Sequence, residues 1–229
     1  MFSFKIRGAY NKMSSLNAKQ RSEGVLCASA GNHAQGLAQA AKLMGVKATI
    51  VMPVTTPEIK VASVRARGAK VVLFGDTFND ALSHALALEK QRNLHFIHPF
   101  DDLEIIAGQG TVAMEIVHQH SAKIDAVFVP VGGGGLIAGI AAYIKTVRPE
   151  TQVIGVEYEE SASLAAAMAA GRRVKLKQVG IFADGIAVAQ VGKHTWPLMK
   201  QYVDGVITVS SDEICAAVKD IFDDTRVIA

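Results

Sequence analysis

Short runs of apolar, often β-branched residues alternate along the chain with longer segments whose apolar positions recur at helical spacing. In the first half, the runs that predict strands are residues 25–29, 48–52, 70–74 and 95–98. The segments between them have the length and end signals of helices, and 32–44 followed by Gly45 is the clearest. Strands separated by helices in this way form parallel sheets with helices on both faces.

The alternation continues in the second half of the chain. Strands are expected at 126–131, 152–157 and 205–209, and helices at 103–120, 136–147, 162–170, 195–203 and from 211 onward. We therefore predict an α/β protein with two doubly wound parallel-sheet units, hinged near 22–24 and 99–102. Ligands of such sheets bind at the carboxyl ends of the strands, which predicts a site in a cleft between the two units.

The composition narrows the possible functions. The chain has 229 residues, half of them hydrophobic, and a net charge of +3 with scattered basic residues, which argues against a nucleic-acid partner. Cys27 and Cys215 lack the spacing of a metal site, and we expect both to be reduced, buried packing residues of a cytoplasmic protein. The segment after Lys5 and Arg7 is not apolar enough for a signal peptide.

One uncharged stretch, residues 126–144, is long enough to cross a bilayer. It contains Pro130 and four successive glycines, and it divides into a β-branched half and a helical half. We therefore expect a strand followed by a helix rather than a membrane span, and no membrane partner.

The four glycines, Gly132 to Gly135, lie where a predicted strand ends and a predicted helix begins. Backbone amides exposed by glycines at a helix N-terminus form a site for a phosphate group. A flexible turn is the simpler alternative, but four glycines carry an entropic cost that a plain turn does not require. The spacing fits neither the dinucleotide-binding pattern nor the P-loop pattern. The sequence thus favours a phosphate of another kind of ligand.

A second loop, residues 28–36, follows the first predicted strand and contains Ser29, Gly31, Asn32 and His33. Its amides could bind a carboxylate while Asn32 donates to a ring oxygen. The alternative is an ordinary N-cap by Ser29 or Asn32 with nothing bound. From this loop alone the two interpretations remain open.

Lys5, taken alone, is most simply an exposed helix lysine. A reactive lysine combined with a phosphate site suggests pyridoxal phosphate. Four segments support this suggestion: residues 3–9, 29–36, 107–111 and 130–136 resemble, in order and spacing, the fold-type II (tryptophan synthase β-like) pyridoxal-phosphate enzymes. Among these the chain is most similar to the biosynthetic threonine dehydratases (threonine ammonia-lyases), and the similarity includes 182–188 and 211–215.

The resemblance implies a role for each matching residue. Lys5 would hold the cofactor covalently and act as the catalytic base, and Asn32 would contact the cofactor's ring hydroxyl. The phosphate loop would consist of Gly132, Gly133, Gly134, Gly135 and Leu136, with Gly185 beside the cofactor ring. The substrate carboxylate would be held by Ser29, Gly31, Asn32 and the amide of His33.

The resemblance also bears on metals. Glu157 aligns with a cation-site carboxylate of the related serine racemases, but Ser163 stands where those enzymes have a second carboxylate. His118 and His120 are two positions apart on a helix and face different directions. We expect no metal, a structural Glu157 and solvent-exposed histidines.

The implied activity is deamination of L-threonine to 2-oxobutanoate and ammonia, the first step of isoleucine biosynthesis, with L-serine as a second substrate. Serine racemases have a serine where this chain has Ala30, which cannot exchange a proton, so elimination is favoured over racemisation. The alternatives are a relative of serine racemase or serine dehydratase, or a catalytically incomplete fragment that only binds phosphate.

The resemblance further implies a domain division. Residues 24–101 would form the small domain, and residues 1–23 with 102–229 part of the large cofactor-binding domain. Both ends of the chain would then be truncated, with the regulatory domain absent, and this chain expressed alone would be nearly inactive. The full-length protein is expected to be a cytoplasmic homo-oligomer.

Overall fold

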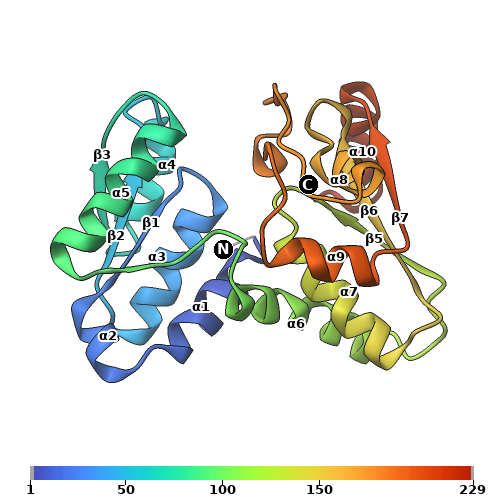
Figure 1. Ribbon diagram of the computed structural model, residues 1–229, viewed down its shortest axis with the longest axis horizontal. Helices are drawn as coiled ribbons and strands as arrows, with labels where there is room; N and C mark the ends of the chain where they lie inside the picture. Colours follow the sequence, from blue (N-terminus) through green and yellow to red (C-terminus); the bar gives the residue numbers. More distant parts are fainter. Residues whose placement is uncertain (1–2, 228–229) are drawn as a thin grey trace. The chain divides into compact units, whose positions relative to one another are not determined.

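The computed structural model describes residues 3–227 (Figure 1). The chain divides into two compact units, Met1–Glu115 and Ile116–Ala229, here called unit 1 and unit 2. Positions 1, 2, 228 and 229 of the predicted large domain lie outside the described residues. The predicted assignment of 1–23 to the same domain as the second half stays a prediction.

Unit 1 is a parallel α/β unit. Its strands are β1 (Val25–Ala28), β2 (Ala48–Met52), β3 (Lys70–Leu73) and β4 (His95–Phe96). Its helices are α1 (Lys5–Ser15), α2 (Ala18–Glu23), α3 (Asn32–Met44), α4 (Glu58–Arg65) and α5 (Phe78–Arg92), and α6 (Leu103–Gln119) runs across the border to unit 2. The strand order is β3-β2-β1-β4, with every pair parallel. The strands predicted for this half are confirmed.

Helices cover both faces of this sheet. On one face, Cys27 of β1 and Ile50 of β2 pack in a core with Leu37 of α3. On the other face, Leu26 of β1 packs in a second core with Ala85 of α5. Successive residues of a strand point to opposite faces, so the uniformly apolar run of β1 is what a strand buried on both sides requires.

Unit 2 contains the second parallel sheet. Its strands are β5 (Ala126–Pro130), β6 (Gln152–Tyr158) and β7 (Gly205–Val209), in the order β5-β6-β7. Its helices are α7 (Gly135–Val147), α8 (Ser163–Ala170), α9 (Thr195–Tyr202) and α10 (Ser211–Thr225), with short 3-10 turns at Glu159–Ser161 and Asp184–Ile186. The uncharged stretch divides into β5 and α7, as predicted. Within residues 3–227 no helix combines the length and apolarity that crossing a membrane requires.

Apart from the interpretation of Lys5 as a helix residue, no helix was predicted before residue 25, so the bounds of α1 and α2 come from the structure. The start of α2 has a recognisable signal: the Asn17 side chain accepts a hydrogen bond from the Gln20 amide, and the Gln20 side chain accepts one from the Asn17 amide. This reciprocal capping box satisfies two amides that a helix N-terminus otherwise leaves without partners.

The cysteine prediction is half wrong. Cys27 is fully buried in β1, as expected, but Cys215 is exposed. Cys215 lies on α10, and none of the residues of this helix is buried. Apolar neighbours in the sequence indicated burial, but no element covers that face of α10 within the described residues.

The two thiols should therefore react differently. Burial raises the pKa of Cys27 well above its ordinary value, and thiolate is the reactive form. We expect a thiol reagent to modify one cysteine per folded chain, Cys215, and both cysteines only after unfolding. Peptide mapping of the labelled protein checks this, and Cys215→Ser should remove the fast reaction. Fast labelling of Cys27 in the folded chain would contradict the structure.

Candidate active site

Lys5 begins helix α1, and its amine is tethered to the main chain. Its Nζ donates a hydrogen bond to the Pro99 carbonyl oxygen at 2.9 Å. Burial lowers the pKa of Lys5 from 10.5 to about 8, because an apolar surrounding disfavours the charged form. The lowered pKa increases the neutral fraction of the amine near neutral pH, which suits a group that must act as nucleophile and base.

The backbone at Lys5 lies close to helix α3. A Cβ atom on Gly36 would lie 3.0 Å from the carbonyl carbon of Lys5 and 3.1 Å from the amide nitrogen of Ile6. Both neighbouring atoms belong to the main chain and cannot rotate away. Gly36 therefore allows α3 to pack against the start of α1, which fixes the lysine relative to the loop preceding α3.

The lowered pKa has a measurable consequence. Amine labelling with acetic anhydride requires the neutral amine, so the labelling of Lys5 should be half-maximal near pH 8. An exposed surface lysine is expected to reach this point at about pH 10.4. Quantitative mass spectrometry of the cofactor-free protein across a pH series measures the difference, and a half-labelling pH of Lys5 at the ordinary lysine value would exclude it.

The loop before α3 has free space around Gly31. Gly31 is the N-cap residue of α3, and no side chain in the described structure caps this helix. The Ser29 hydroxyl accepts a 3.3 Å hydrogen bond from the Gly31 amide, and a Cβ atom on Gly31 would meet no atom within 4 Å. The alternative of an ordinary N-cap by Ser29 or Asn32 is therefore wrong. Asn32 is exposed, and the first amides of α3 fit a carboxylate.

His33 follows in the first turn of α3, and its ring is buried. Its Nε2 lies 2.8 Å from the Ile97 carbonyl oxygen, so this nitrogen carries the proton and donates. Burial, and after it the positive charge of Lys5, lowers the pKa of His33 to about 3. The imidazole is thus neutral at physiological pH. Sequence reasoning had used only the amide of His33.

In unit 2, the glycine loop joins β5 to α7 in a conformation that glycine favours. Gly134 is the N-cap of α7 with a φ of 92°. A Cβ atom on Gly134 would lie 2.5 Å from the Met199 sulfur and 3.0 Å from the Thr195 hydroxyl oxygen. No side chain in the described structure caps α7, so the amides of its first turn can serve a bound phosphate.

A residue that sequence reasoning missed holds this loop. The buried Thr195 hydroxyl donates to the Gly133 carbonyl oxygen at 2.8 Å, and the Gly192 amide donates to the same oxygen at 3.1 Å. On the other side of the loop, a Cβ atom on Gly132 would lie 3.1 Å from the Cα atom of Ile186. The loop is therefore held in place through its main chain, and the binding of a phosphate by its glycines and Leu136 stays a prediction.

Gly185 is less constrained. It lies in the short turn Asp184–Ile186 and is exposed, and a Cβ atom there would meet nothing within 4 Å. No steric contact explains a glycine at this position. Its place beside a cofactor ring stays a prediction.

Glu157 has the structural role expected of it. The carboxylate is fully buried at the end of β6, where it accepts hydrogen bonds from the amides of Leu164 and Ala165, each at 2.8 Å. It thus caps α8, although burial raises its pKa. In the part of the chain that the structure describes, no cluster of three or more His, Cys, Asp or Glu side chains is arranged to hold a metal ion. His118 and His120 are exposed.

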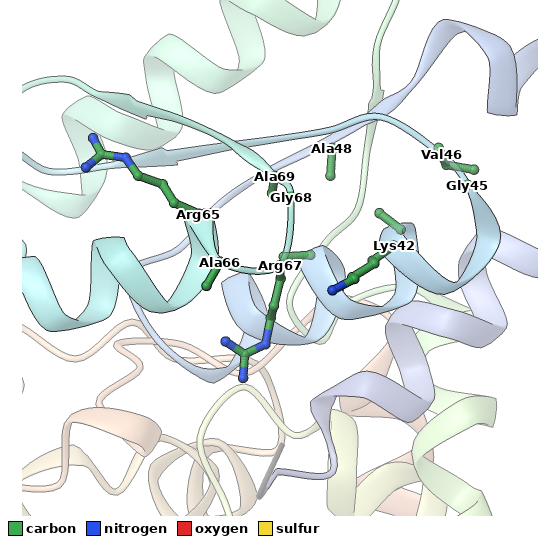
Figure 2. Close-up of a pocket in the computed structure, with 11 residues that line it drawn as sticks. Lys42, Gly45, Val46, Ala48, Arg65, Ala66, Arg67, Gly68 and Ala69 are labelled. Atoms are coloured by element: carbon green, nitrogen blue, oxygen red, sulfur yellow. The ribbon is translucent and has the colours of Figure 1, made fainter.

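A surface cavity of about 360 Å³ lies elsewhere in unit 1, at the ends of α3 and α4 (Figure 2). It contains none of the predicted site residues. Lys42 and Arg67 line it, and Arg67 donates to the carbonyl and hydroxyl oxygens of Ser63. Cations at helix C-termini offset the negative ends of the helix dipoles, so this hollow has a structural explanation.

Comparison with known proteins decides the family. The family model for pyridoxal-phosphate-dependent enzymes matches residues 1–229, the whole chain. The chain belongs to the pyridoxal-phosphate-dependent enzymes. The cofactor and the fold-type II architecture predicted from the sequence are confirmed, because solved structures with this fold superimpose on almost the whole chain.

Threonine dehydratases are prominent among the relatives of this pyridoxal-phosphate-dependent chain. It is 57% identical to the biosynthetic L-threonine dehydratase of Burkholderia multivorans, over 99% of this chain and 45% of that protein. It is 54% identical to the chloroplastic biosynthetic threonine dehydratase of Arabidopsis thaliana, over 99% of this chain and 38% of that protein. The chain therefore spans less than half the length of these curated relatives.

Two solved structures are similar to almost the whole chain. The processed form of threonine deaminase isoform 2 from Solanum lycopersicum matches with a TM-score of 0.97 and 51% identity, covering 99% of this chain and 66% of that one. Maize serine racemase matches with a TM-score of 0.94 and 35% identity, covering 98% and 68%. The pyridoxal-phosphate-dependent fold is shared by both, whereas the sequence is nearer to the deaminase.

Proposed function

We propose that the protein carrying this chain deaminates L-threonine to 2-oxobutanoate and ammonia, with L-serine as a second substrate. The observation that carries the proposal is the sequence identity: more than half of the residues match threonine dehydratases, whereas about a third match maize serine racemase. Several of these relatives are named as biosynthetic, which supports a place in isoleucine biosynthesis.

Each predicted site residue has a role in the proposed chemistry. When bound, pyridoxal phosphate supplies an electron sink for negative charge at the α-carbon of the substrate. Gly132, Gly133, Gly134, Gly135 and Leu136 would hold its phosphate, Asn32 its ring hydroxyl, and Gly185 would lie beside its ring. Lys5 would hold it covalently.

The substrate would be oriented by the loop before α3. The Ser29 hydroxyl, the amide of Gly31, Asn32 and the amide of His33 would bind its carboxylate. The N-cap residue of α3, Gly31, has no side chain that could compete for the first helical amides. The Lys5 amine, whose pKa is about 8, would remove the α-proton. Ala30 offers no group that could return a proton from the opposite face, which favours loss of the β-hydroxyl.

The proposal extends to organisation. We infer a small domain over 24–101, a large domain that includes 1–23 and 102–229, and a homo-oligomeric, cytoplasmic full-length form without nucleic-acid or membrane partners. The relatives differ in location, because those of Arabidopsis and Saccharomyces cerevisiae are named as chloroplastic and mitochondrial.

The test is a comparison of products. Purified protein containing this chain is supplied with pyridoxal phosphate and either L-threonine or L-serine, and both the 2-oxo acid and D-serine are quantified. We expect 2-oxobutanoate from threonine and pyruvate from serine, with D-serine at trace levels. Formation of D-serine at a rate comparable to that of the 2-oxo acid would favour the racemase alternative.

A further inference from the structure

Two side-chain donors of unit 1, the buried His33 and the partly buried Lys5, converge on the short segment Ile97–Pro99. His33 Nε2 donates to the Ile97 carbonyl oxygen at 2.8 Å, and Lys5 Nζ donates to the Pro99 carbonyl oxygen at 2.9 Å. The segment itself is anchored to the sheet, since the Ile97 amide donates to the Leu26 carbonyl oxygen at 2.8 Å. The acceptors of the two side chains are thus only two residues apart.

We propose that His33 is a positioning residue for Lys5: its imidazole fixes the Ile97 carbonyl and thereby orients the Pro99 carbonyl that holds the Lys5 amine. The inference deepens the proposed function, on which it rests for the role of Lys5. It assigns to the His33 side chain a role separate from that of the His33 amide, which would face the substrate carboxylate.

The chemistry of His33 suits this role. A neutral imidazole with its proton on Nε2 is a permanent donor to Ile97, and the low pKa keeps it neutral, so it adds no positive charge beside Lys5. His98 supports the same segment from within, because its Nδ1 accepts hydrogen bonds from the amides of Phe100 and Asp101 at 3.2 and 2.8 Å. The segment is therefore fixed on both sides of Pro99.

The packing of α3 against α1 also links His33 to Lys5. The close approach at Gly36 ties α3, which carries His33, to the start of α1, which carries Lys5. Without the imidazole donor, the buried Ile97 carbonyl would lose its side-chain partner, and the segment would rearrange to find another. The Lys5 amine would then lose its fixed carbonyl acceptor, which stabilises the ammonium form, while the burial that lowers its pKa remains, so its pKa should fall further.

The experiment compares two substitutions at one position. His33→Gln keeps an N–H at a similar reach, whereas His33→Leu keeps the bulk and removes the donor. The readout is the pH at which Lys5 is half-labelled by acetic anhydride in the cofactor-free protein. We expect His33→Gln to stay near pH 8, and His33→Leu to move downward by about one unit, because the ammonium form loses its carbonyl acceptor.

A purely structural histidine would lower stability in His33→Leu and leave the Lys5 labelling curve unchanged, which would overturn the proposal. If His33→Leu fails to fold by circular dichroism, His33→Asn replaces it, since its shorter amide falls short of the Ile97 carbonyl; an unmoved curve there also overturns it. The labelling needs neither cofactor nor substrate, so failure of the deamination assay is a separate result.

Discussion

Lys5→Ala is expected to abolish covalent attachment of pyridoxal phosphate and to reduce 2-oxobutanoate formation by about 10³-fold or more, because one side chain supplies both the nucleophile and the base. In the parent protein, borohydride reduction followed by peptide mapping should find a pyridoxyl group on the peptide that contains Lys5. The variant should give no labelled peptide, although its phosphate loop in unit 2 remains intact.

The matched control is Lys42→Ala. Lys42 is an exposed lysine on α3, at a cavity that we explain by helix-end electrostatics. This variant should keep both the pyridoxyl label and the activity. A pyridoxyl group on any other lysine of the parent protein would contradict the assignment of Lys5. A parent protein without any pyridoxyl label would favour the alternative of a phosphate-binding fragment.

Of the substitutions named in the text, Gly108→Ala should lower the free energy of unfolding the most. Helices α1 and α6 approach each other through glycines, and a Cβ atom on Gly108 would lie 2.6 Å from the Cα atom of Gly8 and 2.7 Å from the Arg7 carbonyl oxygen. Both contacts are with main chain, so the helices must separate. We expect a loss of about 3 kcal/mol in the free energy of unfolding, which outweighs the roughly 1 kcal/mol that alanine gains over glycine in a helix.

Urea denaturation of the variant and the parent protein measures this loss. Gly31→Ala is the control, since a Cβ atom there meets nothing within 4 Å and its φ of −117° is open to any residue. That control should unfold within about 0.5 kcal/mol of the parent. If the parent protein and both variants unfolded at the same urea concentration, the packing of α1 against α6 would not require a glycine at position 108.

Much of the fold followed from local signals. Strand β1 and helix α3 were predicted because the apolar run, the helical period and the closing Gly45 all lie within one short segment. The α1 helix gave a weaker signal, because what buries it is the approach of Gly8, Gly36 and Gly108, which come from three separate helices. Cys215 was misplaced for the opposite reason: its apolar neighbours indicated a covered face that the described chain does not cover.

The candidate site, too, could be predicted only in part from the sequence. The sequence showed which residues could bind a phosphate or a carboxylate, because glycines and polar side chains cluster at helix starts. It could not show that the His33 ring donates to a carbonyl 64 positions away, or that Thr195 holds a carbonyl 62 positions before it. Such contacts depend on how distant segments meet in three dimensions, and no local pattern encodes them.

Because Cys27 is buried and Cys215 is exposed, the folded chain offers a single cysteine for labelling. The chain has two cysteines, and because Cys27 is sealed inside unit 1, a fluorescent dye carrying a maleimide would mark unit 2 alone, on α10, without any engineering of the sequence.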